Sequence, residues 1–232
     1  MKYCLILFIF LPFCSVQAQE ELEVIEVVDS LYREDQFYVG FTFNLLGNRP
    51  GGVSQNGFSG SLQGGFIRDM PINRTRTKAI GIGLGLAADT FNHNLFIGEE
   101  TDGETTIYEV ITSDVDEERN RFTYYSVEMP IEYRWRTSTP TKHSFWRIHA
   151  GARLGYIFRF RSTFEQTSNT VVQTEVPELN RLQYGLTLSF GYGAFNFQGY
   201  YGLNTLFDED ALLRDERVNL QVVRLGLQFF FL

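Results

Sequence analysis

Hydrophobic and polar residues alternate along most of this chain from Gln36 onward. In the first such segment Phe37 and Phe41 fall on one face, while Thr42 and Asn44 fall on the other. A period of two is typical of a β-strand with two chemically different faces. The same alternation recurs in eight segments, which cover residues 37–45, 58–66, 80–89, 124–135, 146–158, 182–192, 195–204 and 223–231.

The connections between these segments also alternate, in length. The short connections cover residues 69–78, 136–144 and 193–194, and the long polar ones cover residues 46–57, 92–120, 161–180 and 207–218. Short turns at one rim and long loops at the other are typical of outer-membrane barrels, whose long loops face outside. The pattern predicts an all-β fold: an eight-stranded antiparallel transmembrane β-barrel with up-and-down topology over residues 36–232.

The two faces of the predicted strands differ in size as well as polarity. One face carries large aromatic and aliphatic side chains, and the other mixes glycine with polar and charged residues. The chain contains 22 Phe and 12 Tyr, more rings than the lumen of an eight-stranded barrel can hold. We therefore expect the apolar face to contact lipid. A secreted β-sandwich or lipocalin-like barrel is the alternative. Interfacial aromatic positions would include Trp135, Trp146, Tyr156, Tyr192 and Tyr201.

The first residues have the pattern of an export signal. Lys2 precedes an apolar stretch over residues 3–14, and small residues follow before a cleavage position. Residues 1–18 are therefore interpreted as a signal peptide, and residues 19–35 as a periplasmic N-terminal segment for which a short helix, a strand and a flexible arm are alternatives. A lipoprotein signal ending at Cys14 is the alternative. Both cysteines of the chain lie inside the leader, so the mature chain would hold no disulfide.

Composition narrows the classes of partner. The formal net charge is −8, and nucleic-acid binding is not expected, because it depends on clustered lysine and arginine. A mean hydropathy of −0.15, with no second long apolar run, excludes a helical multi-pass membrane protein. Acidic residues gather in the connections at 92–120 and 207–218. Such runs are usually solvated, and binding of a divalent cation, directly or as a bridge to lipopolysaccharide phosphates, is the alternative.

Ionisable side chains recur on the polar face of neighbouring segments. The two glutamates of segment 124–135 can face Arg147 and Arg153 across the ladder. We expect an interior network of ion pairs that fills the barrel, because unpaired charge in a narrow lumen is costly. A path for protons or ions is the alternative. The residues concerned are Glu128, Glu132, Arg134, Arg147, His149, Arg153 and Arg224.

Catalysis is not expected from these residues. Of the three histidines, His143 falls in a predicted periplasmic turn and His149 inside the barrel. His93, near Asp89, is the one plausible general base, and no motif connects a nucleophile to it. We therefore predict no catalytic residue, no cofactor and no metal site. A lipid-modifying or peptide-cleaving enzyme is the alternative.

Several stretches resemble known outer-membrane barrels. The last one, Arg224-Leu-Gly-Leu-Gln-Phe-Phe-Phe-Leu232, resembles the C-terminal signal read by the barrel assembly machinery. The stretch Tyr125-Ser-Val-Glu-Met-Pro-Ile-Glu-Tyr133 is similar to a proline-containing strand of the PorT family of small outer-membrane barrels from Bacteroidetes, although Glu132 stands where that family commonly has a basic residue. Residues 151–156 and 200–204 resemble further parts of the family. The resemblance implies an outer-membrane barrel with no known cofactor, and one family member takes part in type IX protein secretion.

We therefore expect a non-enzymatic scaffold or interaction protein of the cell outer membrane. The resemblance to the PorT family implies an accessory role in protein secretion. The expected partners are outer-membrane lipid, lipopolysaccharide and secretion-system proteins. A narrow channel or transporter is the first alternative, and a lipid-modifying enzyme is the second.

Overall fold

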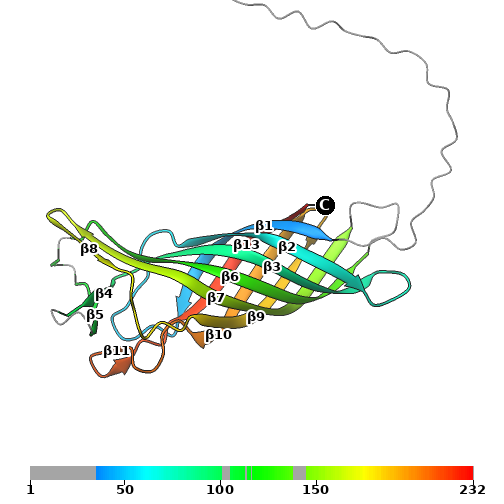
Figure 1. Cartoon of the computed structure of the whole chain (residues 1–232). Coiled ribbons are helices and arrows are strands. Elements are labelled where there is room, and N and C mark those ends of the chain that lie inside the picture. The colour runs from blue at the N-terminus through cyan, green and yellow to red at the C-terminus, as the bar shows by residue number, and fades with distance from the viewer. Residues whose placement is uncertain (1–34, 101–104, 113, 116, 138–144, 232) are drawn as a thin grey trace, which may run out of the picture.

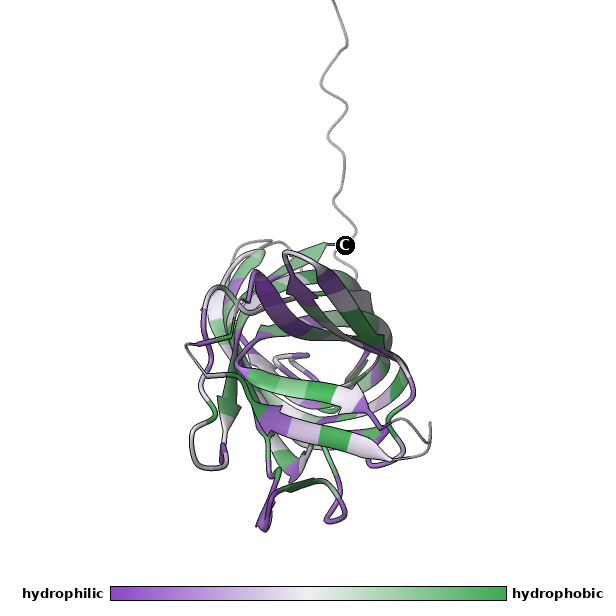
Figure 2. Cartoon of the chain, turned by 90° about the vertical axis from the view of Figure 1, so that its left-hand side faces the viewer, coloured by the Kyte–Doolittle hydropathy of each residue, from purple (hydrophilic) through white to green (hydrophobic). Residues whose placement is uncertain are grey.

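Eight strands form one closed antiparallel barrel in the computed structural model, which describes residues 35–100, 105–112, 114–115, 117–137 and 145–231. Each barrel strand pairs with the next along the chain, and the last strand pairs with the first, which closes the ring (Figures 1 and 2). The strands are β1 (Gln36–Gly47), β2 (Gly60–Pro71), β3 (Lys78–Asn92), β6 (Arg119–Arg136), β7 (Trp146–Gln166), β9 (Leu182–Tyr192), β10 (Phe195–Thr205) and β13 (Gln221–Phe231).

The predicted orientation of the two faces is confirmed. Phe41 and Leu188 are each 55% exposed, whereas Thr42, beside Phe41 on β1, is 5% exposed. The outward residues of all eight strands are predominantly apolar, and they include the five aromatic residues expected at the membrane interfaces. The soluble alternative, with the apolar face inside, is therefore wrong. Among the described residues no helix is long and apolar enough to cross a bilayer.

The two rims differ as the connection lengths predicted. The start of β1 and the end of β13 lie at the rim that holds the short turns, and the long loops lie at the other rim (Figure 1). Gly193 and Ala194 join β9 to β10 in a two-residue turn, where Gly193 has a φ of 60° that glycine adopts without strain. The predicted turns at 69–78 and 136–144 were too long, because Asp69 belongs to β2 and Arg136 to β6.

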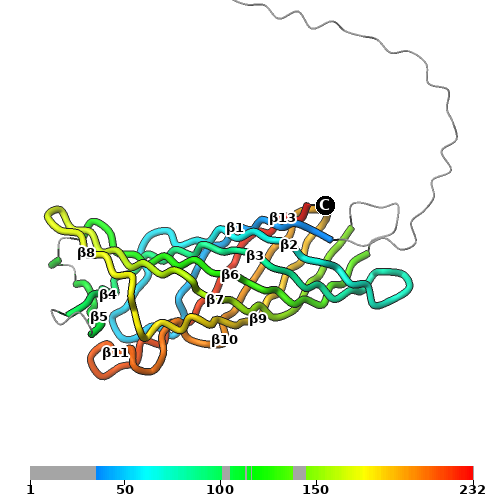
Figure 3. The backbone as a smooth tube through the Cα atoms, viewed as in Figure 1, coloured from blue at the N-terminus to red at the C-terminus, as the bar shows by residue number. Residues whose placement is uncertain are grey.

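Three of the long loops contain short strands where the sequence predicted polar connections. β4 (Leu95–Glu99) pairs with β5 (Thr106–Val110), β11 (Leu212–Leu213) pairs with β12 (Glu216–Arg217), and β8 (Asn169–Gln173) pairs with the outer end of β7. β6 and β7 have 18 and 21 residues, so both continue past the barrel and project from the loop rim (Figure 3). The alternation did not predict these short strands, because each spans too few residues to show a period.

Pro130 lies within β6 without the bulge that a mid-strand proline normally brings. Pairing between β6 and β7 is continuous through Pro130, and pairing with β3 skips only Met129 and Pro130. The register shift of β6 against β7 lies between Tyr125 and Ser126 instead, where Phe158 is the extra residue of β7. The missing N–H of proline therefore coincides with a gap in one ladder that does not shift the register.

Some predictions lie outside the described residues. These are the signal peptide at 1–18, the N-terminal segment at 19–35 apart from Asp35, the turn histidine His143, and part of the acidic loop.

Tyr38 of β1 points into the barrel and packs its ring against the backbone of two neighbouring strands. It is 1% exposed, and a Cβ atom added at Gly85 would overlap the Tyr38 hydroxyl and lie 2.8 Å from the Gly64 carbonyl oxygen. A Cβ atom at Gly64 would instead meet its nearest neighbour at 3.5 Å. Glycine at position 85 therefore gives this ring its space.

We predict that Gly85→Ala lowers the free energy of unfolding by about 1–3 kcal/mol, the usual cost of overpacking. Gly64→Ala is the matched control and should change it by less than about 0.5 kcal/mol. Urea unfolding in detergent micelles measures both variants. Equal stability of the two would contradict the packing described for Tyr38.

Candidate functional site

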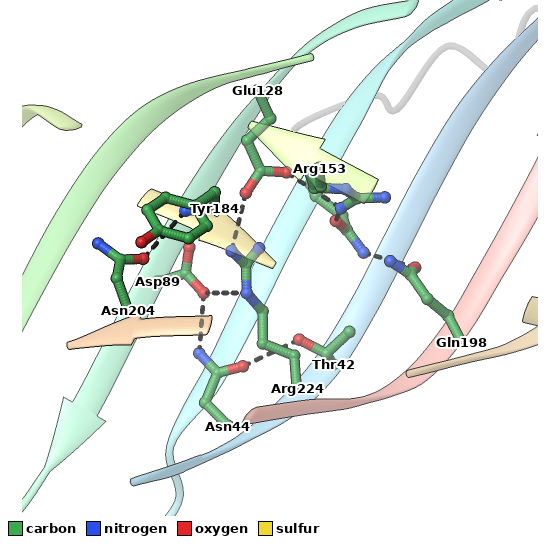
Figure 4. A network of polar contacts seen from close by, with 10 residues as sticks. Thr42, Asn44, Asp89, Glu128, Arg153, Tyr184, Gln198, Asn204 and Arg224 are labelled. Atoms are coloured by element: carbon green, nitrogen blue, oxygen red, sulfur yellow. Dashed lines mark hydrogen bonds and ion pairs between the residues drawn. The ribbon is translucent and has the colours of Figure 1, made fainter. Parts of the chain in front are cut away.

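A buried ion-pair network crosses the middle of the barrel (Figure 4). Arg224 of β13 donates from Nη2 to Glu128 Oε1 at 2.8 Å, and Arg153 of β7 donates from Nη1 to Glu128 Oε2 at 3.0 Å. The Nε atom of Arg224 also lies 3.4 Å from Oδ1 of Asp89 on β3. All four side chains are at most 4% exposed. Charges from four strands therefore meet inside the ring.

Neutral polar groups extend this network to the opposite wall. Asn44 donates from Nδ2 to Asp89 Oδ1 at 3.1 Å, and Thr42 donates to Asn44 Oδ1 at 2.9 Å. Gln63 accepts a hydrogen bond from Arg153 and donates to Gln198 Oε1 at 2.7 Å. The network thus reaches β1, β2 and β10, so residues of seven strands participate in it. Because every barrel strand but β9 contributes, the contacts tie the wall together across its interior.

A second charged cluster lies nearer the rim with the short turns. Oδ1 of Asp69 on β2 accepts a hydrogen bond from Arg134 Nη1 at 3.1 Å, and Oδ2 of the same carboxylate lies 2.8 Å from Arg136 Nη1. Arg134 also donates to Gln36 Oε1 at 2.6 Å. Glu132 Oε2 lies 3.7 Å from both Arg134 Nε and His149 Nδ1. This cluster gives β2 and β6 an ion-paired junction.

The predicted pairing of Glu128 with Arg153 is confirmed, and His149 lies inside the barrel as expected. Arg147, also expected to face a glutamate, instead donates to the Gly193 carbonyl oxygen and lies over the Phe145 ring at 4.3 Å. The charged interior also includes Asp69, Asp89 and Arg136, which were not predicted to belong to the network.

These omissions have a traceable origin. Asp69 and Arg136 were placed in turns because two strands were predicted too short, and Asp89 stood on the polar face without an assigned partner. Extending the predicted segment from residue 66 by three residues includes Asp69 and places it inward. The described interior holds five buried arginines against four buried carboxylates (Arg134, Arg136, Arg147, Arg153 and Arg224 against Asp69, Asp89, Glu128 and Glu132).

The loop end of the interior is apolar rather than charged. We call this cluster the outer plug; it includes Phe91, Tyr124 and Phe160 of the barrel strands together with other buried residues of strands and loops (Leu95, Ile97, Tyr108, Phe122 and Phe207 among them). The Phe122 ring lies 5.6 Å from that of Phe160, and the Tyr108 ring lies 5.7 Å from that of Phe207. Burying these rings against one another stabilises the loops on the barrel.

Hydrogen bonds to one carboxylate hold the loops over the outer plug. Thr106 and Tyr108 of β5 donate to Glu178 Oε2 at 2.9 and 3.3 Å. Burial and the adjacent Glu178 carboxylate raise the pKa of Tyr108, so this phenol stays protonated and remains a donor. The 92–120 and 161–180 loops are thereby joined to each other.

Between the network and the outer plug lies an internal cavity of about 10 Å³, bordered by Glu128, Arg153, Tyr200 and Arg224. This volume holds about one water molecule. Arg224 also lies over the Tyr200 ring at 4.4 Å. The interior at this level is packed with side chains.

His93, the predicted candidate base, is fully buried at the edge of the outer plug. Its Nδ1 accepts the Leu95 N–H at 3.1 Å, and its ring lies 4.8 Å from that of Phe122. Burial lowers the pKa of His93 to about 3, so the imidazole is neutral at pH 7. Asp89 is engaged with Arg224 and Asn44, and no contact between Asp89 and His93 is present in the described part of the chain. The pair is therefore not assembled as a catalytic dyad.

The acidic loops are the candidate sites for a divalent cation. Within the described ranges no group of three or more histidine, aspartate and glutamate residues is arranged to hold a metal ion. Asp114 accepts a hydrogen bond from Thr112, which lowers the pKa of its carboxyl. Part of the acidic cluster, including Asp102, Glu104 and Asp116, lies outside the described residues.

The closed strand ring, its apolar outer wall and its charged interior define an eight-stranded β-barrel that spans the outer membrane. The chain belongs to the family described as outer membrane protein beta-barrel domain, whose model matches residues 17–208. No curated protein matches the chain.

The solved structures that are similar to it include three outer-membrane or engineered proteins. One is Ail, the attachment invasion locus protein of Yersinia pestis, in complex with the heparin analogue sucrose octasulfate, with 13% identity over 87% of this chain and 100% of that chain and a TM-score of 0.34. An engineered protein described for asymmetric conductivity and a mutant of the Rh. blastica porin each show 9% identity over 86% of this chain and 100% of theirs, with TM-scores of 0.22. The strand pairing, rather than these likenesses, establishes the fold.

We predict that Glu128→Gln lowers the free energy of unfolding by about 3–5 kcal/mol, because it leaves Arg153 and Arg224 buried with too little negative charge. Glu100→Gln, a change of the same type in an exposed loop, should change it by less than about 0.5 kcal/mol. Denaturant titration in micelles gives both values. A Glu128→Gln barrel as stable as the Glu100→Gln barrel would show that the network does not support the ring.

Proposed function

We propose that this outer-membrane barrel is a non-enzymatic scaffold or interaction protein, and that its specific role is that of an accessory in a protein secretion system, as in the PorT family. The observation that carries the proposal is the filled interior. Side chains of opposite charge pair across the lumen, and the outer plug occupies its loop end. A barrel whose interior is occupied by its own side chains presents its chemistry on its rims and wall.

The loop rim supports this proposal because it is ordered over much of its length. β4 pairs with β5 and packs against the outer end of β7, with the Phe96 ring of β4 5.2 Å from the Phe164 ring of β7. Val172 of β8 is 42% exposed on this projecting part. Because these projecting strands are already ordered, the binding of a partner to their exposed side chains costs less conformational entropy.

A narrow channel is the first alternative, and the interior argues against it. An ion crossing the barrel would have to displace the Glu128–Arg224 pair and then pass the rings of the outer plug. A lipid-modifying enzyme is the second alternative, and it lacks an accessible base at His93. The carboxylates of the acidic loops are further groups at this rim that can bind a cation or a basic protein surface.

We predict no resolved conductance steps when the purified barrel is inserted in a planar bilayer, because paired charges and packed rings block the axis. A general porin in the same bilayer is the positive control. Reproducible steps in most insertions would favour the channel.

Photo-crosslinking in native outer membranes tests the scaffold role. A photoreactive residue replaces Val172 on the projecting β8 or Ile72 in a short turn, and both positions are exposed. We expect protein adducts at one of these rims, with secretion-system components identified by mass spectrometry. Leu84, 63% exposed on the lipid-facing wall, is the matched control and should yield lipid adducts. Adducts with unrelated proteins only would contradict the secretion role, and no protein adduct at either rim would contradict the scaffold role.

A further inference from the structure

Arginines gather on the outside of one wall of the barrel, directly beyond its lipid-facing belt. Phe158 and Tyr125, 50% and 40% exposed, end the apolar belt on β7 and β6. Arg159 follows Phe158 and pairs across the strands with Tyr125, and Arg161 pairs with Thr123. Both arginine side chains are exposed.

Arg121 completes the group on the neighbouring strand. It stands four residues from Tyr125 along β6, on the same outward face, and is half-buried. At about 3.3 Å per residue, Arg161 and Arg121 lie about 7 and 13 Å along the strands from the Tyr125 level. The tilt of barrel strands shortens these heights along the membrane normal. The three guanidinium groups therefore belong to the headgroup layer of the outer leaflet. We call them the arginine wall.

The arginine wall has no ion-pair partner in the part of the chain that the structure describes. Among the described residues Arg121, Arg159 and Arg161 form no ion pair, although the chain carries a net charge of −8. Glu165, the outward carboxylate on these two strands, lies 3.5 Å from Arg119 instead. Arg181, at the start of β9, is exposed beside the group and donates weakly to the Ile157 carbonyl oxygen at 3.4 Å.

The clustering is confined to this side of the barrel. The outward residues at the loop ends of β1, β10 and β13 are all uncharged (Leu45, Gly47, Tyr201, Leu203, Gln221 and Val223). A general requirement for positive charge near the membrane surface would not select one wall. Three unpaired guanidinium groups beside an apolar surface instead match a ligand that carries phosphate groups above acyl chains, because arginine binds phosphate through paired N–H donors.

We propose that the arginine wall is a binding site for the phosphorylated headgroup of an outer-leaflet glycolipid, the lipid A part of lipopolysaccharide. The acyl chains would lie against the apolar belt around Tyr156 and Leu182, which pair with each other below the site. Arg159 and Arg161 would bind phosphate oxygens, with Arg121 above them. The site is independent of the scaffold role, since it faces lipid and uses no residue of the loop rim tested above.

Binding is measured with the whole barrel in phosphatidylcholine nanodiscs that contain lipid A with both phosphates, or the same lipid with its phosphates removed. Native mass spectrometry counts the lipid A retained. We expect the protein to retain phosphorylated lipid A selectively. The variant R121Q/R159Q/R161Q should bind it about 100-fold more weakly, at about fivefold per arginine for basic groups at a membrane surface.

The matched control is R49Q/R74Q/R214Q, which removes the same charge from three exposed positions elsewhere. It should retain lipid A as the unchanged protein does. An equal loss in both variants, or equal retention of the dephosphorylated lipid by the unchanged protein, would overturn the proposal. Complete displacement by millimolar inorganic phosphate would also overturn it, by assigning the site to free phosphate. The comparison of the two lipids on the unchanged protein decides the question even if the triple variant fails to fold.

Discussion

The structure depends on one constraint, the closure of the backbone hydrogen-bond ring. In hydrocarbon an unpaired strand edge leaves N–H and C=O groups without partners, at a cost of several kcal/mol each. Pairing of β1 with β13 over eleven residue pairs removes that edge. Closure then separates two environments. One face of every strand contacts lipid, which suits apolar side chains such as Phe41 and Leu188, and the other face borders an enclosed interior of fixed width.

The interior follows from that width. Eight strands enclose a lumen that side chains can fill, and this chain fills it in two ways. Glu128 joins Arg153 and Arg224 at mid-height, where a carboxylate bound by two arginines limits the cost of burying charge. Toward the loops, rings such as Phe122 replace the charges. The filled lumen moves any recognition to the rims and the outer wall.

The sequence was most informative where this constraint acts on every residue. Alternation predicted the eight strands and the Glu128–Arg153 pair, and together with the number of large rings it predicted the lipid-facing direction of residues such as Leu154. It failed where the constraint ends. Asp69 and Arg136 stand at strand ends, where one more inward residue cannot be told from a turn, and the short strands β4 and β8 have too few residues for a period to appear. The sequence also could not predict which carboxylate pairs with Arg224, since contacts across a lumen join strands that do not pair with each other.

The most direct test of the central claim is the accessibility of three consecutive positions on β9. Nitroxide labels at Leu186, Thr187 and Leu188 of the bilayer-inserted barrel are compared for collisions with oxygen, which concentrates in lipid. Since Leu186 and Leu188 are 53% and 55% exposed and Thr187 is 8% exposed, the labels at the two leucines should collide frequently and the label at Thr187 rarely. A frequent collision rate at Thr187 with low rates at both leucines would show that the apolar face points inward, and would contradict the account.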